Sequence, residues 1–450
     1  MAQRRINRNS TTPKGFLRRV RDCDFSRIED PRHQPWVQRP LRALLCLAVL
    51  AFATGARSTR AVEDRSEQMK PQIRAKLDIA ERVSDNAFGL ILSQIQWHQL
   101  RGALHRQIKA EWTRKRLQPT RLPQSTVAID GKHLATIDEK RLRALISQNT
   151  SLDGETLDAQ EMRRVLRTQF PYVQLHDDGG RLSGFVRVHR ATLVSSQAAV
   201  VIDQWPIKGE TNEWGTIETT LTALFSAFGR TKIIEMVTVD AGNATKDVAK
   251  KLHARDVDYF MALKSLQGAL HRLAAEKLAE LDGSEAEFCT CFDERGKTIG
   301  YTVWRHRLDD NLGWEGAGEV IRIERVVAGE DSSSVGNRYF VTSALEMDGE
   351  ELLKLARAHW RCENEGHWTA DAIWDEDARR TPWTKHPDGV LVVGLLRAMA
   401  INILAVLRSL SRKKSGCDTW LKPTWKTVIE HTLLVLCEPL LNTEEFDALE

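Results

Sequence analysis

Residues 355–380, LARAHWRCENEGHWTADAIWDEDARR, bring tryptophans, histidines and carboxylates together at helical spacing. On an α-helix, side chains three and four residues apart lie on one face. The residues that share such a face here are Trp360, Glu363, His367 and Asp371, with His359 beside them. The pattern predicts an amphipathic helix that holds Glu363 between imidazole and indole rings.

Two aspartates earlier in the chain each follow a short apolar run typical of a strand. Asp130 closes TVAID, and Asp240 closes IIEMVTVD. Adjacent strands lie roughly 5 Å apart, so strand ends at one edge of a sheet bring such carboxylates together. Mg²⁺ prefers oxygen ligands, and once bound it can activate a nucleophile and stabilise a leaving oxygen. We therefore expect Asp130, Asp240 and Glu363 to meet and to hold divalent metal for phosphodiester chemistry.

Each of these residues also has a simpler interpretation. An aspartate after a strand is commonly a turn or cap residue, and a glutamate on an amphipathic helix is commonly exposed or salt-bridged. His359, Glu363 and His367 could instead form a zinc-binding face, although the chain contains no H-E-x-x-H motif. The tryptophans of the segment could pack in the core or wedge against splayed bases; they are Trp360, Trp368 and Trp374.

Composition and charge indicate a globular protein with a polyanionic partner. The chain has 450 residues, a net charge of +4 and 42% apolar residues, enough for a sizeable core. Residues 1–21 carry basic side chains, Arg4 and Arg5 among them, and no acid. A second basic stretch, residues 105–121, has Glu111 as its one acid. Either stretch could be a solvated surface, but both suit DNA.

The cysteine pattern and the hydropathy of the chain indicate in which cellular compartment the protein works. The seven cysteines are scattered without a C-x-x-C pair, which fits a reducing compartment and argues against a zinc ribbon. The apolar segment Leu41–Ala56 is shorter than the roughly 20 residues that a membrane helix needs. We expect it to be a buried helix, and we expect a cytoplasmic protein without membrane contact.

The periodicity of apolar residues changes along the chain and predicts its organisation. Helical spacing comes first, then strand patterns and a strand-helix-strand alternation, which together indicate an α/β fold with a mixed sheet. The polar stretch Ala144–Arg181 resembles an insert without an evident role. The predicted parts are a basic flexible arm (1–25), a helical N-terminal DNA-binding domain (26–118), a sheet domain with flanking helices (124–283 and 346–450) and an inserted β-rich subdomain (284–345).

An ordered set of motifs extends over most of the chain, from Asp24 to about Leu410. Among them are VAIDGKHL, KGETNE, VTVDAGNATKDVAKKL, DYFMALKSLQGAL and the HW-x-x-EN-x-x-HW pattern around Glu363. The set resembles the DDE transposases of bacterial insertion sequences, specifically the H-repeat-associated branch. The order of the motifs and the arrangement around the glutamate make the resemblance specific.

What the resemblance implies is a ribonuclease-H-like catalytic fold with an inserted β-rich subdomain. It also implies two Mg²⁺ ions, for which Mn²⁺ can substitute, and cleavage of transposon ends followed by strand transfer to target DNA. Asp130, Asp240 and Glu363 match the family's catalytic, metal-binding acids. The resemblance further implies a homodimer in the synaptic complex and a nucleoid-associated protein.

The resemblance and the charge pattern together give a set of expected DNA contacts. Asn212 and Glu213 match the family's KSNE-like segment, together with Lys208. Around the glutamate, Ala356, His359 and Ala370 stand where related enzymes often carry Tyr, Arg and Lys. The expected DNA-binding residues are Arg4, Arg5, Lys132, Lys208, Arg357, His359, Arg361, Asn364 and His367.

Two other functions fit the same acids and charges. The chain could be an inactive or domesticated derivative of a transposase that binds DNA without cutting it, or a different nuclease with the same carboxylate geometry. Retention of all three acids favours the enzyme. Nucleotide-binding and serine-hydrolase motifs are absent, because the sequence has no Walker motif, G-x-G-x-x-G fingerprint or G-x-S-x-G elbow.

Overall fold

The computed structural model describes residues 13–33, 37, 39–79, 82–294, 297–327, 336–377, 386–410, 413–414, 420–421 and 423–437. Five strands form the central part of its sheet: β1 (Thr126–Asp138), β3 (Arg181–Leu193), β4 (Val200–Pro206), β5 (Met236–Val239) and β6 (Asp258–Leu263). Strands β4, β3 and β1 are antiparallel neighbours, whereas β1, β5 and β6 run parallel. The predicted mixed sheet is confirmed.

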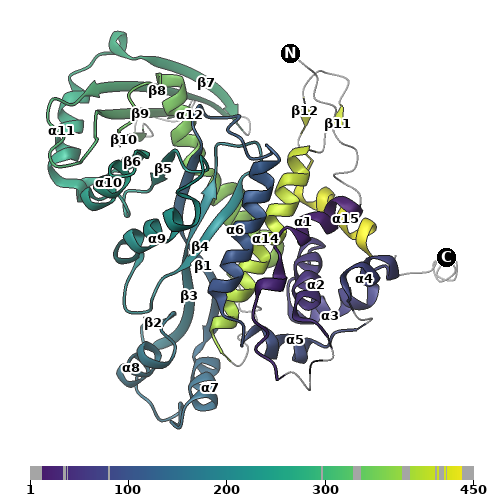
Figure 1. The fold of residues 1–450 in the computed structure, drawn as a ribbon. Coiled ribbons are helices and arrows are strands. Elements are labelled where there is room, and N and C mark those ends of the chain that lie inside the picture. Colours follow the sequence, from purple (N-terminus) through teal and green to yellow (C-terminus); the bar gives the residue numbers. More distant parts are fainter. Residues whose placement is uncertain are drawn as a thin grey trace.

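The β-rich block that follows continues this sheet. Its strands are β7 (Phe288–Glu294), β8 (Lys297–Arg307), β9 (Glu319–Val327) and β10 (Gly336–Thr342). Because β10 pairs with β6, the whole forms one ten-stranded sheet that reaches the upper left of Figure 1. Helices α11 (Gly268–Ala279) and α12 (Gly349–His359) pack against this part of the sheet. The block therefore has no sheet of its own.

The two faces of the sheet are covered by different helices. Side chains alternate along a strand, so Val127 and Ile129 belong to the core cluster that contains α6 (Trp97–Thr113) and α14 (Asp388–Leu410). Ala128 points the other way, into a cluster with α12. Two further helices, α9 (Glu213–Phe228) and α10 (Lys246–His253), connect β4 to β5 and β5 to β6. Whether a strand residue has an odd or an even position in the strand therefore decides which helices its side chain packs against.

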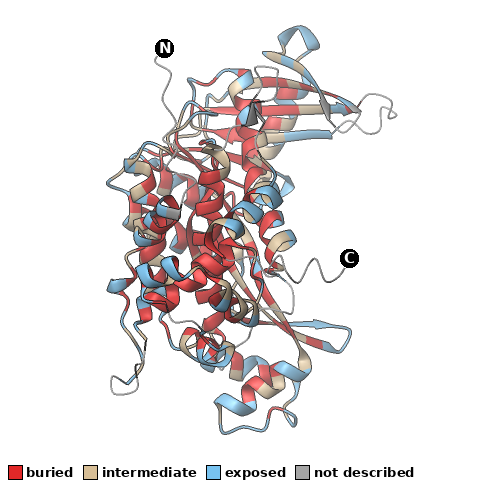
Figure 2. Cartoon of the chain, turned by 90° about the vertical axis from the view of Figure 1, so that its right-hand side faces the viewer, coloured by how far each residue is buried: buried red, intermediate tan, exposed pale blue. Residues whose placement is uncertain are grey.

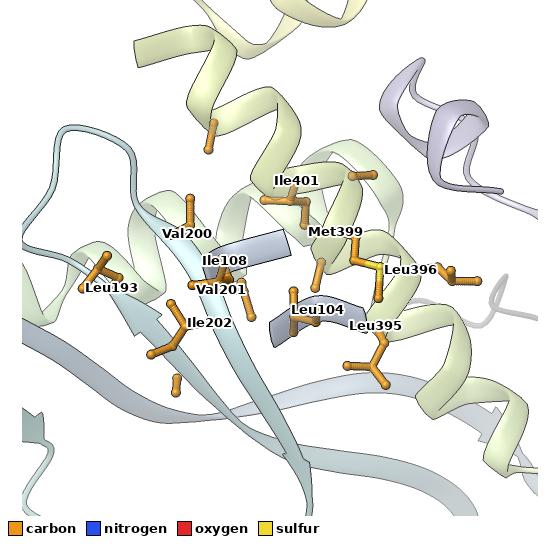
Figure 3. Close-up of a cluster of buried hydrophobic side chains, with 14 of the residues drawn as sticks. Leu104, Ile108, Leu193, Val200, Val201, Ile202, Leu395, Leu396, Met399 and Ile401 are labelled. Atoms are coloured by element: carbon orange, nitrogen blue, oxygen red, sulfur yellow. The ribbon is translucent and has the colours of Figure 1, made fainter. Parts of the chain in front are cut away.

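Helix α14 is the centre of the larger core. It packs against α6, β4 and α2 (Leu41–Ala53), and Figure 3 shows its Leu395, Leu396 and Met399 beside residues of α6 and β4. It is long and apolar enough to cross a membrane, but its most apolar part is entirely buried inside the protein. These contacts are those of a core helix. The predicted buried helix near the N-terminus is likewise confirmed, because every residue of α2 except Arg42 is buried.

The N-terminal helices gather around α14 on the right of Figure 1, and buried residues fill the interior between them and the sheet (Figure 2). The remaining helices of this region are α1 (Pro13–Arg21), α3 (Thr59–Gln68), α4 (Pro71–Leu77), α5 (Asp85–Leu92) and α15 (Trp425–Leu436). Two short strands, β11 (Lys413–Lys414) and β12 (Trp420–Leu421), form a separate pair. Side-chain caps define several helix starts; Ser58, for example, accepts the Ala61 N–H at 3.1 Å and begins α3.

The polar stretch Ala144–Arg181 folds against the far end of the antiparallel pair β1 and β3. It contributes most of α7 (Glu139–Asn149), α8 (Ala159–Gln169) and β2 (Val173–Asp178), which pairs with β3. Ile146 and Met162 are fully buried in a separate core cluster with residues of β1 and β3. The stretch reads as polar because each helix buries only one stripe of side chains.

Candidate active site

The register of β1 and β5 places Asp130 beside Asp240. The last parallel pair joins Ile129 to Val239, and each aspartate is the next residue along its chain. Neighbouring strands are about 4.8 Å apart. Both aspartates have the parity of Ala128 and Thr238, which face away from α14 and toward the α12 side of the sheet. Two residues from distant parts of the sequence thereby share one site.

Asp130 does not end its strand, which corrects the sequence-based expectation. Strand β1 continues to Asp138 because β3 goes on pairing with it after β5 has ended, and Asp130 itself stands opposite Arg190. Asp240 does follow the end of β5, and its Oδ1 accepts hydrogen bonds from the Asn243 N–H at 3.1 Å and the Asn243 side chain at 3.0 Å. One acid is therefore held by a strand and the other by a turn.

Glu363 lies on a π-helical turn, Cys362–His367, between α12 and α13 (Trp368–Trp374). The prediction of one continuous α-helix is wrong here, because the Trp368 N–H bonds the Glu363 carbonyl five residues back. An inserted residue of this kind rotates the side chains that follow, and such turns are frequent at functional sites. The strip of residues inferred from regular helical spacing is thus broken at the glutamate.

Burial and the negative charges of neighbouring acids raise the pKa values of Asp130 and Glu363. Burial raises the pKa of Asp130 to about 7, aided by the negative charges of Glu363 and Asp240 and opposed by the Gly131 N–H and by Arg187. Burial and the charge of Asp240 also raise the pKa of Glu363, while Arg338 opposes the rise. Like charges this close disfavour simultaneous ionisation. Because the charge of Asp240 acts on both Asp130 and Glu363, and the charge of Glu363 also acts on Asp130, the three carboxylates lie near one another.

The three acids do not form a complete metal-binding site in the structure. Among the residues that the structure describes, no group of three or more histidine, cysteine or acidic side chains stands at metal-binding geometry. This finding applies equally to the zinc face considered for His359, Glu363 and His367. The donors available are nevertheless hard carboxylate oxygens whose repulsion a divalent cation would relieve, which suits Mg²⁺ better than zinc.

Two buried histidines contact the strands that position the two aspartates. His367 Nδ1 lies 3.5 Å from Asp130 Oδ2, and His359 Nδ1 lies 3.2 Å from the Thr238 hydroxyl. Burial lowers the pKa of His359 to about 4 and lowers that of His367 well below its ordinary value. Both rings are therefore neutral at pH 7. Buried under the site, they are placed to orient its side chains and not to meet DNA phosphates directly.

An ion pair that the sequence did not reveal lies next to Asp130. Arg187 of β3 pairs with Glu213, the first residue of α9, and Arg187 also acts on the pKa of Asp130. A Cβ atom at Gly131 would collide with the Glu213 carboxylate. The Glu213 carboxylate therefore packs directly against the backbone of Gly131, the residue after Asp130. The KGETNE segment was the available signal for Glu213; nothing in the sequence singled out Arg187.

A second missed cation lies beside Glu363. The guanidinium of Arg338, on β10, stacks over the Trp360 ring with 4.0 Å to the ring centroid. Its charge reaches Glu363, because Arg338 acts to lower the pKa of that glutamate. The residue is exposed and carries a planar array of donors suited to a phosphate. It stands at the point where β10 begins, on the edge of the sheet that carries the acids.

Several expected DNA contacts have protein partners instead. Lys132 is buried and paired with Asp371. Arg361 is buried and donates to the carbonyls of Val194 and Ser196 at the end of β3. Arg357 stacks on Phe292 and Tyr301, with 4.8 Å and 5.2 Å to their ring centroids. These cations therefore fix the turn that carries Glu363 and its neighbouring strands.

Other expected contacts are exposed or lie elsewhere. Asn364 is exposed directly after Glu363, and Lys208 is exposed in the KGETNE segment that leads to Glu213. Arg4 and Arg5 lie outside the described residues. In the basic stretch 105–121, Arg114 pairs with Asp22 at 2.5 Å and Arg106 donates to backbone carbonyls. Arg106 and Arg114, expected there to face DNA, instead tie α6 and the residue after it to the segment that follows α1.

Comparisons with known proteins relate the chain to proteins named as transposases. Residues 23–108 match the family model described as DDE_Tnp_1-associated. The chain is 24% identical over 413 residues to "Putative transposase YncI" of Escherichia coli O157:H7, over 88% of this chain and 91% of that relative. It is 27% identical over 229 residues to "H repeat-associated putative transposase YhhI" of Escherichia coli strain K12, over 48% of this chain and 58% of that relative. The chain thus carries a DDE_Tnp_1-associated domain and is a distant homologue of these proteins.

Proposed function

Starting from this homology, we propose that the chain is a DDE transposase that cleaves the ends of its element and joins them to target DNA. The observation that carries the proposal is that β1 and β5 bring Asp130 beside Asp240, and that, beyond the effect of burial, the charges of Glu363 and Asp240 both raise the pKa of Asp130, although the three residues come from distant parts of the chain. A carboxylate trio at one edge of a mixed sheet is suited to phosphodiester chemistry.

A ribonuclease-H-like fold for the central sheet is part of the proposal. Its support is the order β4-β3-β1-β5-β6, in which three antiparallel strands are followed by two parallel ones. Strands β7 to β10 lie in the sequence between Asp240 and Glu363, as expected for an inserted subdomain. The proposed catalytic domain comprises residues 124–283 and 346–450, with 284–345 as the insertion.

The proposed cofactor is a pair of Mg²⁺ ions, or Mn²⁺ in their place. Asp130, Asp240 and Glu363 would hold them through carboxylate oxygens. When bound, such ions activate a hydroxyl nucleophile and stabilise the leaving oxygen. The protein's own part is to position the carboxylates: β1 and the Asn243 turn fix the two aspartates, and the π-helical turn fixes the glutamate.

DNA would be held around the acids by cations and at a distance by the N-terminal region. Arg338, Lys208 and Asn364 are the exposed candidates at the site. Contacts of this kind are mostly to phosphates, so binding should weaken steeply with salt. We assign residues 26–118 to binding of the element's ends, together with the basic arm that contains Arg4 and Arg5. A homodimer that pairs two ends, at work in the cytoplasm on the nucleoid, completes the proposal.

A cleavage assay tests this function. The substrate is a supercoiled plasmid that carries the DNA segments flanking the gene in its genome, incubated with Mg²⁺ or Mn²⁺. The chain should nick the plasmid and transfer the ends, and Asp240→Asn should abolish both. The control is Asp309→Asn, an exposed aspartate at the opposite end of the sheet, which should cut normally.

The two rival functions predict different results. A binding protein without catalytic activity would retard the same DNA in a gel but never nick it with either metal. A nuclease of another kind would cut without joining ends. Equal nicking by Asp240→Asn and its parent would remove that aspartate from the mechanism.

A further inference from the structure

The segment from Glu363 to Glu376 contacts β1 and β3 through polar and charged side chains. Three contacts follow one another along it: His367 with Asp130 at 3.5 Å, Asp371 with Lys132, and Glu376 with Arg190 at 3.0 Å. A charged group needs one particular partner, whereas apolar groups can pack in several ways. The segment therefore meets the sheet in a defined register.

The two strands present the partners of this segment on one face. Asp130 of β1 stands directly opposite Arg190 of β3 in their antiparallel ladder, and the side chains of opposite residues project to the same side. Lys132, two residues further along β1, shares that side because side chains alternate along a strand. Arg190 therefore lies in the same row of the sheet as the first aspartate of the candidate site.

The ion pair between Arg190 and Glu376 is the most deeply buried of the three contacts. Its two side chains are 0% and 1% exposed, and Arg190 also donates to Gln204 of β4 at 3.0 Å. Taking two charges out of water costs about as much as their attraction returns, so such a pair adds little stability compared with apolar packing. Fixing the position of the parts that it joins is a better explanation for a pair at this place.

The segment is also held at both of its ends. Before the π-helical turn, Arg361 donates to the carbonyls at the end of β3. After α13, Trp374 donates its indole N–H to the Phe52 carbonyl at 2.8 Å, and Asp375 pairs with Arg57 at 3.1 Å. The π-helical turn therefore lies between two fixed points, and the pair with Arg190 belongs to the second of them.

We propose that Arg190 and Glu376 are positioning residues, whose buried ion pair holds the segment where Glu363 can share metal with the two aspartates. The inference rests on the proposed function and adds to it two residues that bind neither metal nor DNA. Breaking or shortening the pair would let the segment shift over β1, and Glu363 would shift with it. Replacing residues that orient metal ligands typically lowers metal affinity about 10- to 100-fold.

Binding of Mn²⁺ to the full chain without DNA tests the inference independently of catalysis. The electron paramagnetic resonance signal of free Mn²⁺ measures the affinity. Glu376→Gln removes the charge of the pair, and Glu376→Asp keeps the charge on a shorter side chain. Both should weaken Mn²⁺ binding about ten-fold, because the segment is no longer held in place. Glu376→Asp retains the buried counter-charge of Arg190 and should stay folded, which circular dichroism checks.

Glu319→Gln is the matched control. Glu319 of β9 is also buried, and it pairs with Arg305 of β8 at 2.6 Å. Strands β6 and β10 lie between β9 and β5, so the control pair is remote from the aspartates. This substitution should lower the midpoint of thermal unfolding and leave the affinity for Mn²⁺ at the value of the parent chain.

The outcomes separate the inference from the proposed function. Parental Mn²⁺ affinity in a folded Glu376 variant, or an equal loss in Glu319→Gln, overturns the positioning role, even if the parent nicks DNA. The expected loss of affinity in a chain whose parent never nicks DNA does the reverse, because the pair would then position a metal site that does not cut. A parent chain that binds no Mn²⁺ overturns both.

Discussion

The surroundings of Asp130 arise because β1 changes its neighbouring strands at this residue. Up to Ile129 the strand β1 is paired on both sides, and from Asp130 onward only β3 continues beside it. The opening left by β5 is where Asp240 and the π-helical turn with Glu363 approach. An aspartate in the middle of a strand can therefore belong to a site that is built at the end of its neighbour.

Gly131 shows how closely the surroundings of this aspartate are packed. In Gly131→Ala the new methyl group would displace the flexible Glu213 carboxylate and disturb its pair with Arg187. We expect the free energy of unfolding to fall by less than about 1 kcal/mol, because only a side-chain tip must move. Cleavage should slow by about 10- to 100-fold, since small misplacements near reacting groups are costly.

Gly336→Ala is the matched control for this change. Gly336 also lies in a strand, and no atom stands within 4 Å of the place its Cβ would take. It should cut DNA at the parent's rate. Urea denaturation and the plasmid assay measure the two effects separately, and full activity in Gly131→Ala would contradict a role for the Arg187–Glu213 pair.

At the scale of elements, the contact between β4, α6 and α14 depends on a few buried polar groups. Asn402 of α14 accepts the Val201 N–H at 2.8 Å and donates to the Val201 carbonyl at 2.7 Å. It also donates to Gln107 of α6 at 3.2 Å. These bonds satisfy the outer edge of β4 inside an apolar core, where an unpaired polar group is expensive.

Asn402→Ala should destabilise the protein by about 3 kcal/mol or more, because it leaves several buried groups without a partner. Asn149→Ala is the control, since Asn149 is exposed and makes one local bond to the Leu145 carbonyl. Its free energy of unfolding should change by no more than about 0.5 kcal/mol. Equal urea midpoints for the two variants would refute the importance of the Asn402 bonds.

Asp203 joins β4 to α6 through charge. Its carboxylate accepts bonds from Arg101 at 2.6 Å and 2.5 Å and lies 3.0 Å from His105 Nε2. Burial raises the pKa of Asp203, but His105 and Arg101 outweigh burial and lower that pKa from 3.8 to about 2. The stabilisation is therefore complete above pH 3.8 and is lost as the pH falls toward about 2.

Asp203→Asn removes this titration. We expect the variant to be less stable at pH 7 by about 3 kcal/mol, because Arg101 is left without its buried counter-charge. Between pH 3.8 and about 2, its free energy of unfolding should fall less steeply than that of the parent. Chemical denaturation at a series of pH values measures both slopes, and parallel curves would show that Asp203 does not titrate as stated.

At the scale of the whole molecule, the N-terminal helices and the sheet share one core. Helix α14, from the end of the chain, packs against α2, α6 and β4 at once. A fragment of residues 1–118 would lose α14 and expose the apolar faces of α2 and α6. We expect that fragment to lack a cooperative thermal transition, whereas the full chain should have one. A sharp transition in the isolated fragment, followed by circular dichroism, would show instead that the region folds by itself.

Local patterns in the sequence were enough to predict most elements and to select the three acids. Apolar runs and motif order pointed to Asp130, Asp240 and Glu363, because strand and helix periodicity is a property of neighbouring residues. The buried helix α2 and the mixed sheet followed from the same patterns. Local patterns also misled: regular helical spacing around Glu363 hid a π-helical turn, since one inserted residue leaves no mark on composition.

How charges pair and which side chains stay exposed depends on the folded arrangement of the chain. Lys132 and Arg361 look like DNA contacts in the sequence, yet they are buried against Asp371 and the end of β3. Arg187 lies in no motif, and Arg338 opens the family motif RYFVTSAL without being singled out there; both reach the site because strands remote in sequence lie beside it. The physical reason is that a charge acts through space: its neighbours are set by strand register and helix packing, which the order of residues along the chain does not display.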